Sequence, residues 1–222
     1  MRILAYIYYL ITSLRNFLFD KKILPIHRVD GVEIICIGNI TVGGTGKTPA
    51  VQYFVKKLQK EGRKVAVVSR GYRGKRKCDP CLVSDGEKIL CTPRESGDEP
   101  YIHALNLDVP IIVSSNRYKA CLFAKKNFDI DTIVLDDGFQ HRKLYRDRNI
   151  VLIDATNPFG MWKLLPAGTL REDFMKAGKR ATEFIITKSD LVSEGESYRK
   201  LKHFFVQYKH TAVWFPSARQ PS

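Results

Sequence analysis

The 222-residue sequence lacks several features that define large classes of proteins. Its N-terminal apolar stretch, residues 3–11, is shorter than the run of about 20 apolar residues that a membrane-spanning helix needs. No small-residue cleavage site follows this stretch, which argues against a secretory signal. The chain also has no internal repeat and no low-complexity tract, while 44% hydrophobic residues allow a proper core. We therefore expect a globular protein.

Acidic residues are also in short supply. There are 23 Asp and Glu against 37 Lys and Arg, which gives a net charge of +14. This excess favours an anionic partner such as a nucleic acid, a phosphorylated metabolite or an acidic membrane surface. Charge alone does not choose among the three.

Cysteines are few and odd in number, which argues against a disulfide framework and suits reduced thiols in the cytosol. They are Cys36, Cys78, Cys81, Cys91 and Cys121. Cys78-Asp-Pro-Cys81 has the spacing of a zinc knuckle, but no second CxxC or HxxxH pair follows it. We expect a turn that holds two thiols rather than a metal site.

The first 22 residues have the pattern of an amphipathic helix. Apolar residues fill positions 3–11 and continue at helical spacing, with Arg15 and Asn16 on the other side. Three tyrosines and a cationic surround suit a helix lying in the lipid interface, and we predict that position for it. A helix packed on the protein's own core is the alternative.

The rest of the chain alternates between short β-rich runs and helical patterns. Strands are expected at residues 32–37, 65–68, 109–113, 132–135, 150–153 and 183–187, and a hairpin at 81–91. Helices are expected at residues 49–61, 117–128 and 198–206. This order predicts an α/β fold of the P-loop NTPase type, with a mainly parallel sheet flanked by helices. The basic segment 72–77 is expected to be an exposed loop, and the polar end of the chain looks disordered or cut.

A glycine-rich loop follows the first predicted strand and precedes a helix. A P-loop requires G-x-x-x-x-G-K-[ST], because consecutive backbone N–H groups must point into one concavity at a helix N-terminus. Here Thr41 replaces the first glycine, and Gly46-Lys47-Thr48 is intact. Lys47 would reach the β- and γ-phosphates, and the Thr48 hydroxyl would ligate Mg²⁺. The expected nucleotide-binding residues are Thr41, Val42, Gly43, Gly44, Thr45, Gly46, Lys47 and Thr48.

Two acidic elements could complete a kinase site. The strand at 132–135 ends in Asp136-Asp137-Gly138, where paired carboxylates suit a metal ion, and Gln140 and His141 follow at once. Asp98 and Glu99, in Gly97-Asp-Glu-Pro100, could be the first turn of a helix. A carboxylate there could equally take a proton from an attacking hydroxyl. The pattern alone leaves both alternatives open.

A further motif favours a different nucleotide. Thr187-Lys-Ser-Asp190, at the end of a predicted strand, resembles the [NT]KxD element with which many P-loop GTPases recognise guanine. A membrane-associated GTPase-like switch is therefore an alternative function.

Together these motifs resemble the tetraacyldisaccharide 4'-kinase family, the lipid A 4'-kinases of Gram-negative bacteria. The shared segments are IGNITVGGTGKTP, SRGYRG, GDEP, NRYK, LDDGFQHRKLYRDRNIVLID and LLPAGTLRE, in that order. The resemblance covers nearly the whole chain up to about residue 190, and Thr at the first P-loop position is a family trait.

The resemblance implies an ATP- and Mg²⁺-dependent kinase at the cytoplasmic face of the bacterial inner membrane. It would phosphorylate the 4'-hydroxyl of an acylated glucosamine disaccharide 1-phosphate, a substrate in an anionic bilayer that suits the positive charge better than a nucleic acid does. It also implies the following roles. The catalytic residues would be Asp98 as base, Glu99, Lys47 and His141; the metal would bind Thr48, Asp136 and Asp137; and the cleft would include Arg70, Arg117, Gln140, Arg171 and Glu172.

The sequence departs from the family at its C-terminal end. Family members continue into a segment with an F-x-D-H type motif, whose histidine is thought to pair with the GDEP aspartate, and His203 and His210 stand in the wrong context for it. The chain is expected to be a fragment or a natural truncation, so a non-catalytic paralogue that binds nucleotide or lipid is a further alternative. The expected organisation is a membrane-associated helix at 1–22, a kinase domain at 30–190 and the start of a C-terminal lobe at 191–222.

Overall fold

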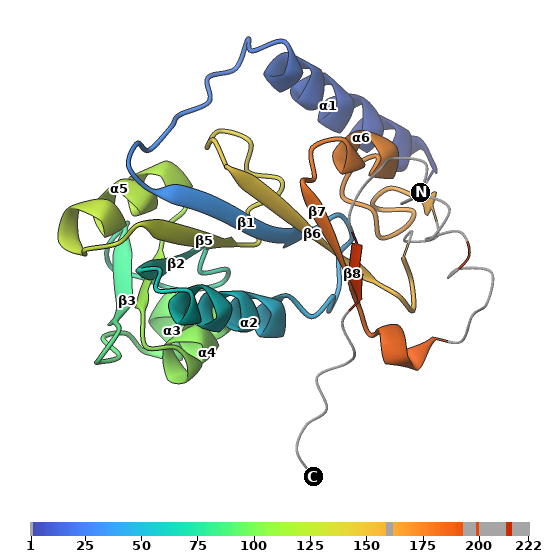
Figure 1. Ribbon diagram of the computed structural model, residues 1–222. Helices are drawn as coiled ribbons and strands as arrows, with labels where there is room; N and C mark the ends of the chain where they lie inside the picture. The colour runs from blue at the N-terminus through green and yellow to red at the C-terminus, as the bar shows by residue number, and fades with distance from the viewer. Residues whose placement is uncertain (1, 159–161, 193–198, 200–211, 215–222) are drawn as a thin grey trace. The chain divides into compact units, whose positions relative to one another are not determined.

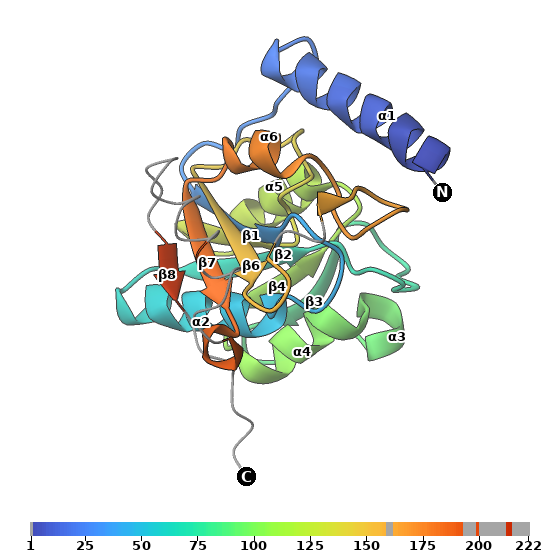
Figure 2. The same ribbon diagram turned by 90° about the vertical axis from the view of Figure 1, so that its right-hand side faces the viewer.

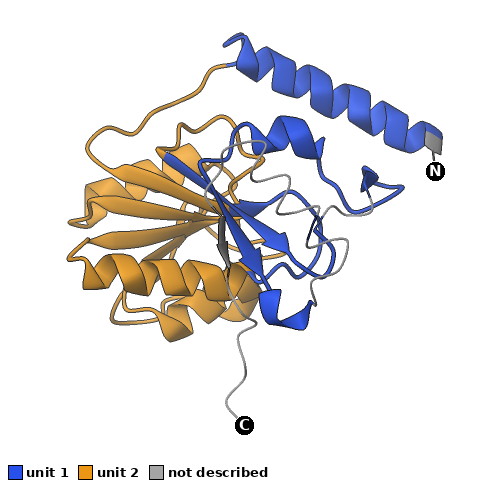
Figure 3. Cartoon of the chain, turned by 45° about the vertical axis from the view of Figure 1, so that its right-hand side comes forward, with its two compact units in different colours: residues 1–24, 38–46, 148–222 blue, residues 25–37, 47–147 orange. Residues whose placement is uncertain are grey.

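The structure, a computed structural model, describes residues 2–158, 162–192, 199 and 212–214. The chain divides into two compact units, which Figure 3 colours separately. Unit 1 comprises Met1–Leu24, Gly38–Gly46 and Arg148–Ser222, and unit 2 comprises Pro25–Ile37 and Lys47–Asp147.

Unit 2 is built on a mainly parallel sheet. Its strands are β1 (Glu33–Asn39, the last two residues of which belong to unit 1), β2 (Val65–Ser69), β3 (Cys81–Asp85), β4 (Pro110–Val113) and β5 (Thr132–Asp136). They lie in the order β3-β4-β2-β5-β1, and all neighbours are parallel except β3, which runs antiparallel to β4. Every residue of β2 and β5 is buried, as expected of parallel strands covered on both faces.

Four helices cover this sheet. They are α2 (Lys47–Lys60), α3 (Pro93–Ser96), α4 (Asp98–Asn106) and α5 (Arg117–Asn127). Figures 1 and 2 show α2, α3 and α4 on one face of the unit 2 strands and α5 on the other. The apolar stripe predicted for α2 is buried, because Val51, Phe54, Val55 and Leu58 face the sheet. The Asn116 side chain caps α5 by accepting a hydrogen bond from Lys119 N at 3.2 Å.

Unit 1 contains α1 (Arg2–Asp20), β6 (Arg148–Asp154), α6 (Phe174–Gly178), β7 (Glu183–Thr187), the 3₁₀ helix η2 (Ser189–Leu191) and β8 (Ala212–Trp214). Its three strands are parallel, with β7 between β6 and β8. The α1 helix lies beside α6, where Lys176 Nζ is 3.3 Å from Tyr9 Oη (Figure 1). The described part of the chain contains no helix that is both long and apolar enough to cross a membrane.

Most predicted elements are confirmed within one or two residues. The hairpin prediction is confirmed in part: the turn after Asp85 forms, Leu90 N donates to Val83 O, and Ser84 and Ile89 form an isolated antiparallel bridge. Only the first arm is a strand, however, and its partner strand is β4. The predicted helix at 198–206, His203, His210 and the end of the chain lie outside the described residues. The proposed division at residues 22, 30 and 190 stays a prediction.

Candidate active site

The glycine loop runs from the end of β1 into α2 and is anchored at Thr45. Asn39 Nδ2 donates to Thr45 Oγ1 at 2.8 Å, and Thr187 Oγ1 donates to Thr45 O at 3.1 Å. Val42, Gly43 and Gly44 are exposed. The positive φ of Gly46, 75°, is a conformation that favours glycine just before the helix begins. The loop is therefore held in place at Thr45 and exposed at residues 42–44, as a phosphate-binding loop requires.

The α2 helix begins at Lys47, and Thr48 is its second residue. Both side chains are half-buried. The first turn of α2 contains no acidic residue, so its free N–H groups and the Lys47 charge form a cationic N-terminus. This end of α2 is suited to an anionic phosphate.

Asp136 ends β5 as a carboxylate that is only 1% exposed. Its Oδ2 lies 3.3 Å from Ser69 Oγ and 3.3 Å from His103 Nε2. Its Oδ1 is buried and has no hydrogen-bond partner among the described residues. A buried acceptor without a partner is rare in folded proteins, and a bound cation would satisfy it. The donor set therefore fits a hard cation such as Mg²⁺.

Asp137 follows in the left-handed conformation, with a φ of 50°, and its N–H donates to Ile37 O at 3.0 Å. This backbone arrangement turns the chain sharply after β5. The described residues include no group of three His, Cys, Asp or Glu able to hold a metal. The described residues thus offer too few ligands to hold Mg²⁺ by themselves, and phosphate oxygens and waters would complete its coordination, as is usual in nucleotide sites.

Asp98 and Glu99 form the first turn of α4, and both are exposed. Although Glu99 keeps contact with solvent, partial loss of hydration raises its pKa, and the Asp136 carboxylate adds to the rise while Lys47 opposes it. Lys47, Asp136 and Asp137 thus all act electrostatically on Glu99 within unit 2. The four residues come from three predicted motifs that lie far apart in the sequence.

Two glycines bring the SRGYRG and GDEP segments into backbone contact. A Cβ at Gly71 would lie 2.6 Å from Ser96 O, and a Cβ at Gly97 would lie 2.7 Å from Tyr72 O. Both residues have a positive φ, 63° and 88°. Because only glycine allows this approach, Arg70 and Asp98, which each adjoin one of these glycines, are held at a fixed separation.

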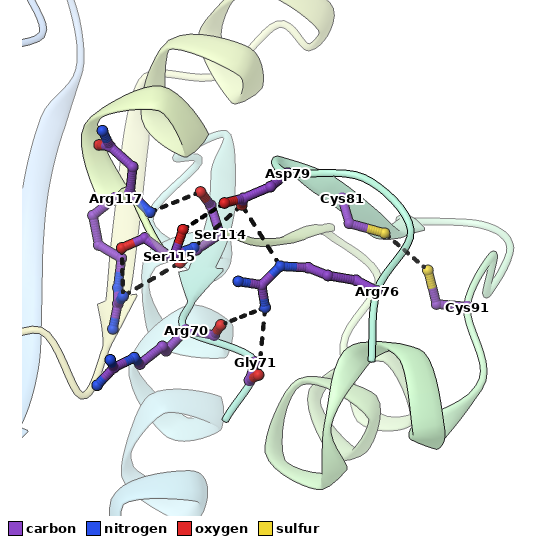
Figure 4. A network of polar contacts seen from close by, with 10 residues as sticks. Arg70, Gly71, Arg76, Asp79, Cys81, Cys91, Ser114, Ser115 and Arg117 are labelled. Atoms are coloured by element: carbon purple, nitrogen blue, oxygen red, sulfur yellow. Dashed lines mark hydrogen bonds and ion pairs between the residues drawn. The ribbon is translucent and has the colours of Figure 1, made fainter. Parts of the chain in front are cut away.

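Arg70 and Arg117 extend toward the same region of unit 2 (Figure 4). Arg117 is 4% exposed, and its Nη1 donates to Ser114 O at 3.3 Å. Burial lowers the pKa of Arg117, and the positive charge of Arg70 lowers it further. Two neighbouring guanidinium groups favour an anionic ligand between or beside them.

Arg76 connects Arg70, which follows β2, to Asp79, which lies just before β3. Its Nη1 donates to Arg70 O at 3.0 Å, and its Nε lies 3.6 Å from Asp79 Oδ1 (Figure 4). Asp79 also accepts hydrogen bonds from the N–H and the hydroxyl of Ser115.

Cys81 Sγ and Cys91 Sγ lie 3.4 Å apart nearby, and all five cysteines are free thiols.

The loop after Asp137 carries Gln140 and His141, which are both half-buried. Arg146 holds this loop, because its Nη1 donates to Gly138 O at 2.9 Å and to Phe139 O at 3.1 Å. Three residues of the site were not predicted: Ser69, His103 and Arg146. The i+4 spacing of His103 from Glu99 was a signal that could have identified it, whereas the contacts of Ser69 and Arg146 depend on tertiary structure.

The predicted cleft residues Arg171 and Glu172 belong to unit 1. Arg171 N donates to Ile40 O at 2.8 Å, which attaches this segment to the start of the glycine loop. The Glu172 carboxylate, 4% exposed, accepts hydrogen bonds from Asn16 Nδ2 at 2.9 Å and Arg180 Nη2 at 2.8 Å. In this structure Glu172 therefore anchors α1.

The Thr187–Asp190 motif also lies in unit 1, at the end of β7. Lys188 Nζ forms an ion pair with Asp154 Oδ2 at 2.5 Å. Thr187 connects the motif to the glycine loop through Thr45. The motif thus lies close to Thr45 of the glycine loop, within its own unit.

Comparison with known proteins identifies relatives along the whole chain. The family model described as tetraacyldisaccharide-1-P 4'-kinase matches residues 1–219. The tetraacyldisaccharide 4'-kinase of Halothermothrix orenii is 44% identical over 215 residues, which cover 96% of this chain and 55% of that protein. That of Geobacter sulfurreducens is 41% identical over 187 residues, which cover 83% and 52%. The chain thus spans about half the length of the curated relatives it matches.

Solved structures agree with the family match. The crystal structure of LpxK from Aquifex aeolicus in complex with ATP has a TM-score of 0.77 and 29% identity, covering 99% of this chain and 83% of that one. FtsY from Thermotoga maritima, 15% identical with a TM-score of 0.55 over 89% of this chain and 65% of that one, shares the fold. The predicted P-loop NTPase-like α/β fold is confirmed. The chain belongs to the tetraacyldisaccharide-1-P 4'-kinase family.

Proposed function

We propose that this chain carries the nucleotide site of an ATP-dependent kinase that phosphorylates the 4'-hydroxyl of the tetraacyldisaccharide 1-phosphate precursor of lipid A. One observation carries the proposal. Lys47, at the N-terminus of α2, and the buried Asp136 both act electrostatically on Glu99, and Asp136 Oδ1 is buried without a hydrogen-bond partner among the described residues. Phosphoryl transfer needs both kinds of group, a cation that binds phosphate and a carboxylate that can bind the metal.

The residues of the glycine loop would hold the nucleotide. The N–H groups of Val42 and Thr45 already donate to Thr169 O and Gly43 O, so those of Gly43, Gly44 and Gly46 and the Lys47 ammonium would bind the phosphates. Thr48, Asp136 and Asp137 would hold Mg²⁺. When bound, Mg²⁺ neutralises the phosphate oxygens and so lowers the cost of charge developing on them. Gln140 and His141 follow the metal-binding pair and would line the same site.

Asp98 is our candidate for the general base. It is exposed in the first turn of α4, where its carboxylate can accept the proton of an incoming hydroxyl. The raised pKa of Glu99 makes its carboxylate a stronger proton acceptor once ionised, so Glu99 is a second candidate for the base. Arg70 and Arg117 would bind a phosphate of the nucleotide or of the sugar, and Arg171 would lie beside the glycine loop.

The α1 helix supports a location at a membrane surface. Its large apolar side chains are exposed along one face, at Ile3, Ile7, Leu10, Leu14 and Phe17 among others. Its other face is tied to unit 1, because Tyr8 Oη donates to Arg171 O at 2.7 Å and Asn16 contacts Glu172. An apolar face with Lys21 and Lys22 at its end, on a chain of charge +14, suits an anionic bilayer. We assign the protein to the cytoplasmic face of the inner membrane, with a lipid-linked sugar and no nucleic acid as partner.

Transfer of ³²P from ATP to the acylated disaccharide 1-phosphate in detergent tests the activity. We expect labelled lipid with the wild-type chain and a loss of at least about 100-fold with Lys47→Ala or Asp98→Ala. Lys57→Ala, on the far end of α2, and Asp108→Ala, after α4, are matched exposed controls that should keep full activity. Activity that survives both site substitutions would exclude the proposal. Normal Mg·ATP affinity without turnover, restored by adding the C-terminal segment of a relative, would favour the non-catalytic alternative.

The GTPase alternative has one structural observation in its favour, the hydrogen bond from Thr187 to the glycine loop. Competition binding separates the two functions. A preference for GTP over ATP of tenfold, about 1.4 kcal/mol, would favour the switch.

A further inference from the structure

His103 is a buried titratable residue to which neither the sequence motifs nor the proposed function assigns a role. It lies on α4 one turn after Glu99, and its side chain is 0% exposed. Its Nε2 lies 3.3 Å from Asp136 Oδ2, and its Nδ1 has no hydrogen-bond partner in the part of the chain that the structure describes. A buried imidazole whose one polar contact is with a candidate metal ligand calls for an explanation beyond packing.

The contacts of the Asp136 carboxylate are divided unequally between its two oxygens. Oδ2 takes part in hydrogen bonds with both His103 Nε2 and Ser69 Oγ, each at 3.3 Å. An ionised carboxylate only accepts hydrogen bonds, so Nε2 must carry the hydrogen in this pair. Two donors on Oδ2 restrict the rotation of the carboxylate. They leave Oδ1, which is buried and has no partner among the described residues, as the atom available to a ligand.

We propose that His103 is a positioning residue, which holds Asp136 so that Oδ1 is available to the Mg²⁺ of the bound nucleotide. This inference rests on the proposed function. Partners that orient metal-binding side chains typically change metal affinity by about 10–100-fold when they are lost. The Ser69 hydroxyl is the second donor, but it can rotate to other acceptors, whereas the imidazole on α4 is fixed by its burial.

Four variants of the full chain test this role, with Mn²⁺ as the metal. His103→Leu replaces the imidazole with an apolar side chain of similar size and so removes the donor. His103→Gln supplies an N–H donor in place of Nε2. The third variant, His103→Leu with Asp136→Asn, completes a double-mutant cycle with Asp136→Asn alone. Calorimetry gives the affinity for Mn·ATP and, in EDTA, for metal-free ATP. The electron paramagnetic resonance spectrum of bound Mn²⁺ reports the metal environment, and thermal unfolding confirms that each variant is folded.

We expect His103→Leu to weaken Mn·ATP binding by about tenfold or more and to leave metal-free ATP binding unchanged. His103→Gln should recover most of the affinity, and His103→Leu should have no further effect once Asp136 is Asn. Three results would overturn this inference but not the proposed function. The first is equal Mn·ATP affinity in wild type and His103→Leu, and the second is an equal loss of affinity for Mn·ATP and for metal-free ATP. The third is a loss of Mn·ATP affinity caused by His103→Leu that persists in the Asp136→Asn background. A wild-type chain that binds no Mn·ATP would instead remove the proposed function and this inference with it.

Discussion

At the scale of single residues, the reciprocal contact of Gly71 and Gly97 explains how two loops reach the site together. Each glycine approaches a carbonyl oxygen of the other segment more closely than any Cβ could. The sequence motifs contain these glycines, but glycine is common in turns for several reasons. Only the structure shows that they face each other, and so set the position of Asp98 relative to Arg70.

Replacing Gly97 with Ala should therefore be costly. The positive φ of 88° adds strain, and the new Cβ would lie 2.7 Å from Tyr72 O. We expect a loss of about 2–4 kcal/mol in the free energy of unfolding, measured by urea denaturation. Gly62→Ala is the matched control, because Gly62 has a φ of 79° and a Cβ there would have no atom within 4 Å. It should lose only about 1 kcal/mol. Equal losses in the two variants would show that the close contact contributes nothing.

Asp154 supplies a pH-dependent contribution to stability. Burial raises its pKa, but the ion pair with Lys188 and hydrogen bonds from Thr156 outweigh burial, so the pKa is lowered overall. A lowered pKa gives stability that is present above about pH 4 and is lost as the pH falls through the folded-state value. We expect Asp154→Asn to flatten the fall in melting temperature between pH 5 and 3, while Asp108→Asn, an exposed control, keeps the wild-type profile. A wild-type profile for Asp154→Asn would contradict this assignment.

At the scale of elements, a buried polar cluster attaches α1 to the rest of unit 1. Glu172 accepts hydrogen bonds from Asn16 on α1 and from Arg180, and the side chains of the Arg180–Glu172 pair are only 15% and 5% exposed. Loss of one charge in such a pair leaves the other buried without compensation. The polar side of α1 is thus held in place, while its apolar side remains exposed.

Glu172→Gln should consequently destabilise the protein by about 2–4 kcal/mol. Glu183→Gln is a matched control, because the Arg148–Glu183 pair also has two short N···O contacts, but its side chains are 35% and 33% exposed. The control should lose no more than about 1 kcal/mol. Urea denaturation compares the two, and an equal small loss would argue against Glu172 as the anchor of α1.

The sequence predicted elements far better than the contacts among them. Strands such as residues 132–136 are continuous apolar runs, and the helical stripe at 51–58 has a clear period, so both follow from local pattern. The partner of β3 was not predictable, because pairing with β4 depends on the tertiary arrangement of residues 25 positions or more apart. Asp98 and Asp136 were predicted from motifs, and their roles stay predictions, whereas the contacts of Ser69, His103 and Arg146 exist only in the folded chain.

At the scale of the whole molecule, the net charge of +14 and the exposed apolar face of α1 predict binding to anionic membranes. The chain should co-sediment with phosphatidylglycerol vesicles and release as salt is raised, because screening weakens the attraction. Leu14→Asp should reduce binding by about tenfold, since it removes apolar area from the interface. Leu191→Asp changes an equally exposed leucine, 60%, outside α1 and should bind as the wild type does. Equal binding by both variants would exclude α1 as the membrane contact.

The most consequential expectation is that this chain binds Mg·ATP through Lys47 and the carboxylates of unit 2. Calorimetric titration of the wild-type chain, Lys47→Ala and Lys57→Ala with ATP, with and without Mg²⁺, tests it most directly. We expect saturable binding by the wild type that is stronger with Mg²⁺, a loss of about 100-fold or more in Lys47→Ala, and unchanged affinity in Lys57→Ala. Binding of equal strength in Lys47→Ala, or no binding by the wild-type chain, would contradict it.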